Sequence, residues 1–216
     1  MSLTKSRLEL HRWTKSMPDN MSANTSFPAI RVRIGYPWAK DDDGLVASRS
    51  DSRLQCIRGW VKSAGDTVKN SITKWRPGST AFRLDVSRLR ATHGQMLLHN
   101  LCDRIQSADI LLFDIGACDG KRFNENVVLE AGMALAFSTV MAKRIFILKP
   151  KKLAHPSDLQ GFLVSNYRLE EGVERLELED GLGFHAALRS AIRDVAEIRG
   201  MVGPASKRSD DDEDDA

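Results

Sequence analysis

A solitary carboxylate in a long apolar stretch is the side chain best suited to chemistry in this sequence. Glu130 is the only charged residue between positions 127 and 142. A carboxylate buried there without a partner costs on the order of several kcal/mol, so it must be paired, lose its charge or face a cleft. We predict a helix that begins near Asn126, whose side chain caps it, and that places Glu130 within about one turn of its N-terminus. The positive end of the helix dipole would then help to keep Glu130 ionised.

A second carboxylate, Asp114, ends the apolar run that precedes this helix. Residues 110–113 and 145–148 are uninterrupted apolar runs, which are typical of parallel strands covered on both faces, and with the helix they form a βαβ unit. Ligands bind at the carboxyl edge of such sheets. We therefore predict that Asp114 and Glu130 face one crevice as a catalytic pair. In the alternative interpretation Glu130 interacts only with the helix end or with an arginine, and Asp114 only fixes the loop.

The first strand of the predicted sheet carries an unusual pair of charges. Residues 30–34 alternate apolar side chains with Arg31 and Arg33, and a ligand-facing turn of sequence Gly-Tyr-Pro-Trp follows. A covered parallel strand is normally apolar throughout. Either the two arginines lie at a strand margin, or one of them reaches the site.

The remaining elements follow from hydrophobic periodicity and from turn residues. The spacing predicts a surface helix over 53–69 whose basic residues, Arg53 among them, form a solvated face. Residues 79–92 fit either a strand or an irregular basic loop, in which Arg83, Arg88 and Arg90 are candidates for a phosphate clamp. The other predicted elements are a strand over 72–76, a helix over 94–107, a strand over 164–169 and a terminal helix over 183–199.

Together these elements predict a single α/β domain of Rossmann-like (flavodoxin-like) type, with a mostly parallel sheet of about five strands flanked by helices. We expect this domain to span residues 29–200, preceded by a mobile segment, 1–28, and followed by a disordered acidic tail, 201–216. The length of 216 residues and the hydrophobic content of 42% suit one such domain.

Charge and cysteine content bear on partners and location. The chain has a formal charge of +3, and the acidic residues at 210–215 contribute −6, so the remainder carries +9 by subtraction. A basic body attracts phosphate-bearing ligands or nucleic acid, and the tail is either an internal competitor for that surface or simply a solvated end. Three cysteines without a CxxC pair argue against a disulfide framework or a zinc site. With no secretory signal and no apolar run long enough for a bilayer, we expect a cytoplasmic protein that does not associate with membranes.

The residues around Glu130 follow a pattern that resembles the nucleoside 2-deoxyribosyltransferase-like superfamily, to which the TIR-like NAD-cleaving domains of bacterial defence systems are related. The pattern is an apolar strand ending in Asp, a variable loop, Asn-x-Asn-Val, Glu-x-Gly-x-Ala, a basic residue and a second apolar strand. The resemblance extends over roughly residues 30–198. The matching residues are Asp114, Asn124, Asn126, Val127, Glu130, Gly132 and Ala134.

The resemblance implies cleavage of an N-glycosidic bond in a nucleotide, a nucleoside or NAD, by hydrolysis or by transfer. Glu130 would attack the sugar C1′ and Asp114 would assist at the base, with NAD or the nucleotide as substrate and no cofactor or metal. Relatives imply a homo-oligomer and a role in antiviral defence or as a toxin effector. The alternative is a non-catalytic nucleotide-sensing or binding module whose basic surface meets a protein or nucleic-acid partner.

The chemistry of such a substrate identifies further candidate binding residues. Amide side chains hydrogen-bond ribose hydroxyls, aromatic rings stack on bases, and glycines allow close approach of a ligand to the backbone. The predicted substrate-binding residues are Gly35, Tyr36, Trp38, Gly116, Asn124 and Asn126.

Overall fold

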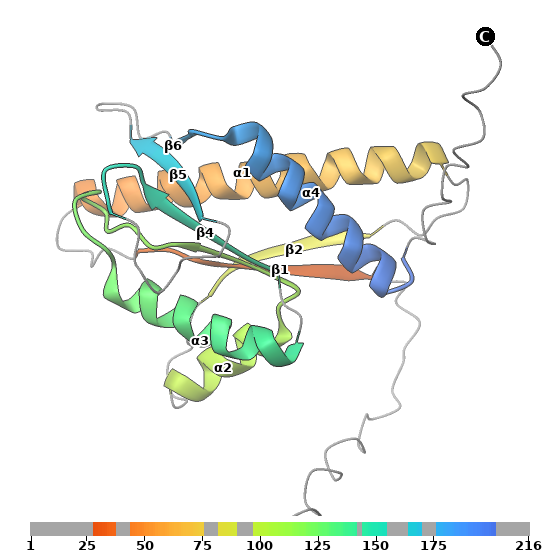
Figure 1. Ribbon diagram of the computed structural model, residues 1–216, viewed down its shortest axis with the longest axis horizontal. Helices are drawn as coiled ribbons and strands as arrows, with labels where there is room; N and C mark the ends of the chain where they lie inside the picture. The colour runs from red at the N-terminus through yellow and green to blue at the C-terminus, as the bar shows by residue number, and fades with distance from the viewer. Residues whose placement is uncertain are drawn as a thin grey trace, which may run out of the picture.

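Six strands form one sheet in the spatial order β2-β1-β3-β4-β5-β6 within the described part of the chain (Figure 1). The computed structural model describes residues 28–37, 44–75, 82–89, 97–141, 144–154, 164–169 and 176–201. The strands are β1 (Ala29–Gly35), β2 (Arg83–Arg88), β3 (Ile110–Asp114), β4 (Arg144–Pro150), β5 (Val164–Leu169) and β6 (Leu176–Leu178). The first five run parallel, and β6 pairs antiparallel with β5.

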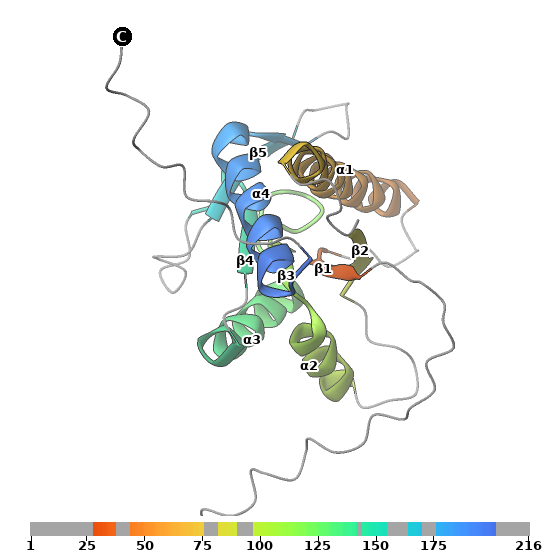
Figure 2. The same cartoon turned by 90° about the vertical axis from the view of Figure 1, so that its right-hand side faces the viewer.

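Helices cover both faces of this sheet. The helices are α1 (Gly44–Trp75), α2 (Leu97–Ser107), α3 (Glu125–Met141) and α4 (Gly181–Ile198). Figures 1 and 2 show α1 and α4 on one face and α2 and α3 on the other. The predicted single α/β domain of flavodoxin-like type is therefore confirmed, with β6 as a strand that the sequence did not indicate.

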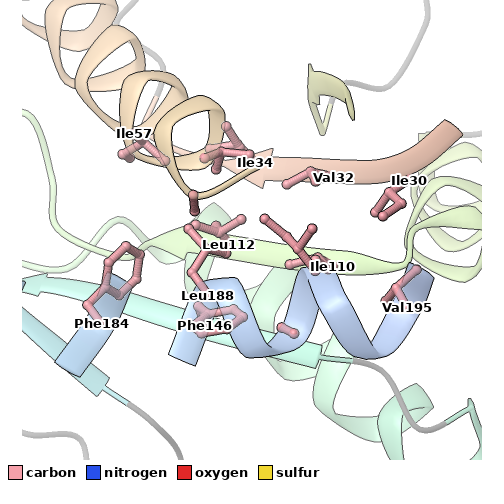
Figure 3. Packing of buried hydrophobic residues seen from close by; sticks show 14 of the residues in the cluster. Ile30, Val32, Ile34, Ile57, Ile110, Leu112, Phe146, Phe184, Leu188 and Val195 are labelled. Carbon is pink, nitrogen blue, oxygen red and sulfur yellow. The ribbon is translucent and has the colours of Figure 1, made fainter. Parts of the chain in front are cut away.

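The two faces bury separate apolar clusters, because successive strand residues point to opposite sides of the sheet. Ile34 and Leu112 pack towards α1 and α4, next to Ile57 and Leu188 (Figure 3). Phe113 belongs to the cluster beneath α2 and α3. This alternation decides on which side of the sheet each polar residue near the strand ends must lie.

The strand predicted over 72–76 is wrong, because α1 continues through this segment to Trp75. Val68 and Ile72 are both buried, one helical turn apart. That spacing continues the apolar stripe of the preceding turns, so Ile72 belongs to the helix. The second strand lies later, at Arg83–Arg88, so the described part of the ambiguous segment contains a strand.

The arginines of β1 occupy its less buried side. Arg31 is exposed, and Arg33 donates to the Oδ2 atom of Asp85 in β2 at 2.9 Å. Arg33 is 13% exposed and is engaged with the neighbouring strand through Asp85. Several predictions fall outside the described residues: the terminal segments except Pro28 and Met201, and the side chains of Trp38 and Arg90.

Among the described helices, none combines the length and hydropathy needed to cross a bilayer.

Candidate functional site

The strand order places a topological switch point between β1 and β3. From β1 the chain passes through α1 to β2 on one side, and then returns through α2, on the opposite face, to β3. In open α/β sheets, ligands bind at the carboxyl ends of the two strands that flank such a point. Here those ends are Gly35 and Asp114. Any functional group beside them is a candidate for the site.

Glu130 lies directly against the end of β1. A Cβ atom built on Gly35 would be 2.8 Å from the Oε2 atom of Glu130 and 2.6 Å from Cδ1 of Phe113. Only glycine leaves room for the carboxylate at this distance from the strand. The side chain therefore occupies the carboxyl edge of the sheet, where the sequence predicted it, and it approaches from the face covered by α3.

Burial makes Glu130 an unusual carboxylate. It raises the pKa of Glu130 from 4.5 to about 7, and no charged group contributes to that rise. Among the described residues, neither a hydrogen bond nor a charged neighbour contributes to the pKa of its carboxylate. A carboxyl group with a pKa close to neutrality is suited to exchange a proton or to act as a nucleophile under physiological conditions.

The N-terminal cap of α3 differs from the prediction. The α3 helix begins at Glu125, and the Oδ1 atom of Asn124, not that of Asn126, accepts a hydrogen bond from the backbone N–H of Val127 at 3.1 Å. Glu130 is therefore roughly 7.5 Å along the helix axis from the first residue. Burial outweighs any contribution of the helix dipole, because the pKa of Glu130 lies above its ordinary value.

Asp114 does not share a crevice with Glu130, and that prediction is also wrong. Its side chain is 0% exposed and points to the face of α1, as the alternation along β3 requires. Its Oδ2 atom accepts from Arg53 at 2.5 Å, and Oδ1 accepts from the Tyr167 hydroxyl at 2.7 Å and from the Gly116 N–H at 3.2 Å. Burial raises the pKa of Asp114, and these partners oppose that rise. Asp114 fixes the loop after β3 in the manner of the alternative interpretation.

Arg53 is the centre of this buried network, although the sequence predicted it on a solvated face. Its side chain is 2% exposed, and it also donates to the carbonyl oxygens of Ala117 at 2.9 Å and Gly116 at 3.2 Å. A further hydrogen bond joins it to the Tyr167 hydroxyl. The spacing of residues in the sequence could have indicated this burial. Arg53 lies four residues before the buried Ile57 and hence on the buried stripe of α1.

The loop between β3 and α3 is held as a small hairpin on this network. Gly116 and Phe123 form an isolated antiparallel bridge, and Ala117 N–H donates to the Arg122 carbonyl at 2.8 Å. Gly120, with φ of 66°, supplies the left-handed turn at the tip. Gly116 is constrained by packing, since a Cβ there would lie 2.7 Å from the Tyr167 hydroxyl. The loop is thus rigidly placed beside the switch point.

The other predicted binding residues are dispersed. Tyr36 is 9% exposed and its ring lies under the guanidinium of Arg88, at 5.1 Å from the ring centroid, so this ring is covered on that face. Asn124 caps α3, and Asn126 is exposed on the same helix. Among the described residues, no cluster of three His, Cys, Asp or Glu side chains could hold a metal ion.

The close approach at Gly35 leads to a stability prediction. Gly35→Ala is expected to lower the free energy of unfolding by about 1 to 2 kcal/mol, because the new methyl group overlaps Phe113 and the carboxylate of Glu130. Gly132→Ala is the matched control, since a Cβ there meets nothing within 4 Å and alanine favours a helix by about 0.5–1 kcal/mol. Urea denaturation of both variants measures the difference; equal stabilities would contradict the contact.

Comparison of the chain with models of known protein families and with curated proteins found no match.

Proposed function

We propose that the protein cleaves the N-glycosidic bond of a nucleotide, nucleoside or NAD at the carboxyl edge of β1 and β3, with Glu130 as the reacting carboxylate. The observation that carries the proposal is a half-buried carboxylate, unpaired among the described residues, whose pKa is about 7, at the switch point of the sheet. Structural carboxylates are normally paired when they are buried. A carboxylate that is unpaired and has a pKa near neutrality at a ligand-binding edge is therefore a functional candidate.

The chemistry of the bond suits such a group. Cleavage develops positive charge at C1′, so an adjacent carboxylate stabilises an oxocarbenium-like transition state or forms a covalent glycosyl-enzyme. Water or a second nucleobase then takes the sugar, which corresponds to hydrolysis or transfer. Asp114 takes no part at the reacting atoms in this scheme, and it acts as a positioning residue for the loop beside the site.

A binding module without turnover is the second candidate function. The specific observation in its favour is the placement of Asp114, which is fully buried, bonded to Arg53 and turned to the face opposite Glu130. Asp114 therefore supplies no acid to assist the departing base. The same edge would then hold a nucleotide as a signal, and the basic surface would meet a protein or nucleic-acid partner.

Incubation of the full chain with NAD, ATP, deoxynucleoside monophosphates and nucleosides, followed by chromatography, separates the two functions. Cleavage predicts free base from at least one substrate. Glu130→Gln removes the reacting carboxylate while keeping its shape, and it is expected to abolish release of the base. Base release that survives this substitution would contradict the mechanism, and ligand binding without any product would favour the binding module.

A further inference from the structure

We infer that Arg88 receives the anionic group of the ligand, so that the site takes phosphate-bearing nucleotides in preference to neutral nucleosides. The inference rests on the proposed function for the position of the reacting bond at Glu130. It is carried by an arginine that is oriented by an aromatic ring and paired with an exposed carboxylate at the same edge of the sheet.

Arg88 is at the carboxyl edge because it is the last residue of β2. It pairs in register with Ile34 of β1, the residue before Gly35. Its guanidinium lies 5.1 Å from the centroid of the Tyr36 ring, and 22% of its side chain is exposed. A cation over a ring face is held in orientation without losing its hydrogen-bond donors. The guanidinium is therefore held in orientation and is partly exposed.

Gly35, the last residue of β1, and Tyr36, the residue after it, bring Glu130 and Arg88 to the two sides of one strand end. Gly35 meets the carboxylate of Glu130 on the α3 face. Tyr36 belongs to the apolar cluster on the α1 face and carries Arg88 over its ring. A ligand lying across the end of β1 would thus meet the carboxylate on one side and the guanidinium on the other. A 5′-nucleotide carries its phosphate and its glycosidic bond on the same sugar, so one ligand would bring both groups to this strand end.

Asp51 indicates where the anion would bind. Its Oδ1 atom accepts from Nη2 of Arg88 at 2.6 Å, and its own side chain is 62% exposed. An ion pair with one exposed partner is weak and readily exchanged. A phosphate offers several oxygens to the planar fork of the guanidinium and is a stronger partner than one carboxylate oxygen. Asp51 would therefore be displaced by the ligand.

Arg83 provides a matched control on the same strand. It is the first residue of β2 and is exposed, so it lies at the opposite edge of the sheet. Of the basic residues predicted to form a phosphate clamp, Arg88 therefore lies at the carboxyl edge of the sheet and Arg83 at the opposite edge. Replacing either by methionine removes one positive charge and keeps the apolar stem, which leaves the net charge of the two variants equal.

Calorimetric titration with the four ribonucleosides and their 5′-monophosphates, at one fixed ionic strength, tests the inference on the full chain. At least one monophosphate is expected to bind the wild type roughly 10-fold more tightly than its nucleoside. Arg88→Met should reduce that ratio to below about 2-fold, whereas Arg83→Met should leave it unchanged. Asp51→Asn should tighten monophosphate binding alone, by about 3-fold, because the competing carboxylate is gone.

Equal affinity for the two ligand classes, absence of binding, or a ratio insensitive to Arg88→Met would overturn the inference. If Arg88→Met does not fold, Asp51→Asn tests the inference by itself. An unchanged affinity of Asp51→Asn for the monophosphate rejects displacement of the Asp51 carboxylate by the ligand. The proposed cleavage fails separately: a monophosphate preference without base release leaves the assignment of Arg88 standing. Base release from nucleosides and monophosphates with equal kcat/KM rejects Arg88 and leaves the cleavage.

Discussion

Replacing Arg53 by methionine is expected to lower the free energy of unfolding by about 3–5 kcal/mol, the cost of leaving a buried charge without its partner. The reason is the complete burial of Asp114, which has no exposed surface and relies on Arg53 at 2.5 Å. The substitution also leaves the carbonyl oxygens of Gly116 and Ala117 without the donor that Arg53 provides. For a chain of this size the melting temperature should fall by roughly 10 °C, which urea denaturation and calorimetry can measure.

Arg168→Met is the matched control for this experiment. Arg168 also pairs with a carboxylate, that of Glu179 at 3.3 Å, but its side chain is 61% exposed. Removing it should change stability by no more than about 0.5 kcal/mol. The double variant Arg53→Met, Asp114→Asn should lose less than the sum of the two single variants, because neither charge is then left alone. An Arg53→Met variant as stable as Arg168→Met would show that the network contributes nothing.

The network also illustrates what the sequence could and could not predict. Apolar runs and their spacing were sufficient for the parallel sheet, for α3 and α4, and for the carboxyl edge as the position of Glu130, because burial of apolar surface dictates these patterns locally. Helix residues 53 and 57 lie on one stripe, but a positive charge on a helix is usually solvated. Two partners of Arg53, Asp114 in β3 and Tyr167 in β5, lie 61 and 114 residues further along the chain.

The side-chain direction of Asp114 was only partly predictable from the sequence. Ile110, Leu112 and Asp114 alternate with Leu111 and Phe113, so one of the two sets must face α1 and the other α3. What the sequence lacks is the assignment of each set to a face, which depends on the crossover that each helix makes. Two carboxylates at one strand-to-helix connection are therefore compatible with a shared crevice or with opposite faces, and only the tertiary structure decides between them.

Glu130→Gln is expected to stabilise the protein in alkaline solution, even though it removes the proposed reacting group. The folded state binds the Glu130 proton more tightly, with a pKa of about 7 against 4.5 for the ordinary group. The free energy of unfolding therefore falls as the pH rises from about 4.5 to above 7, and it is highest below that window. Glutamine resembles the protonated form at every pH. At pH 8 the variant should be more stable than the wild type by about 2 kcal/mol, allowing for partial exposure, and at pH 4.5 the two should be nearly equal.

Glu125→Gln is the control, since Glu125 is exposed in the first turn of the same helix. Its effect should stay within about 0.5 kcal/mol at both pH values.

Catalysis should respond in the opposite direction to stability. If the ionised carboxylate reacts at C1′, base release by the wild type should increase through about pH 7, and Glu130→Gln should reduce it by about 100-fold or more. A carboxylate retained only for packing would give the same pH-dependent gain in stability, because that gain follows from burial alone, but it would give no loss of turnover. A reacting group at this position must give both, because the burial that destabilises its charge is what keeps it reactive near neutral pH.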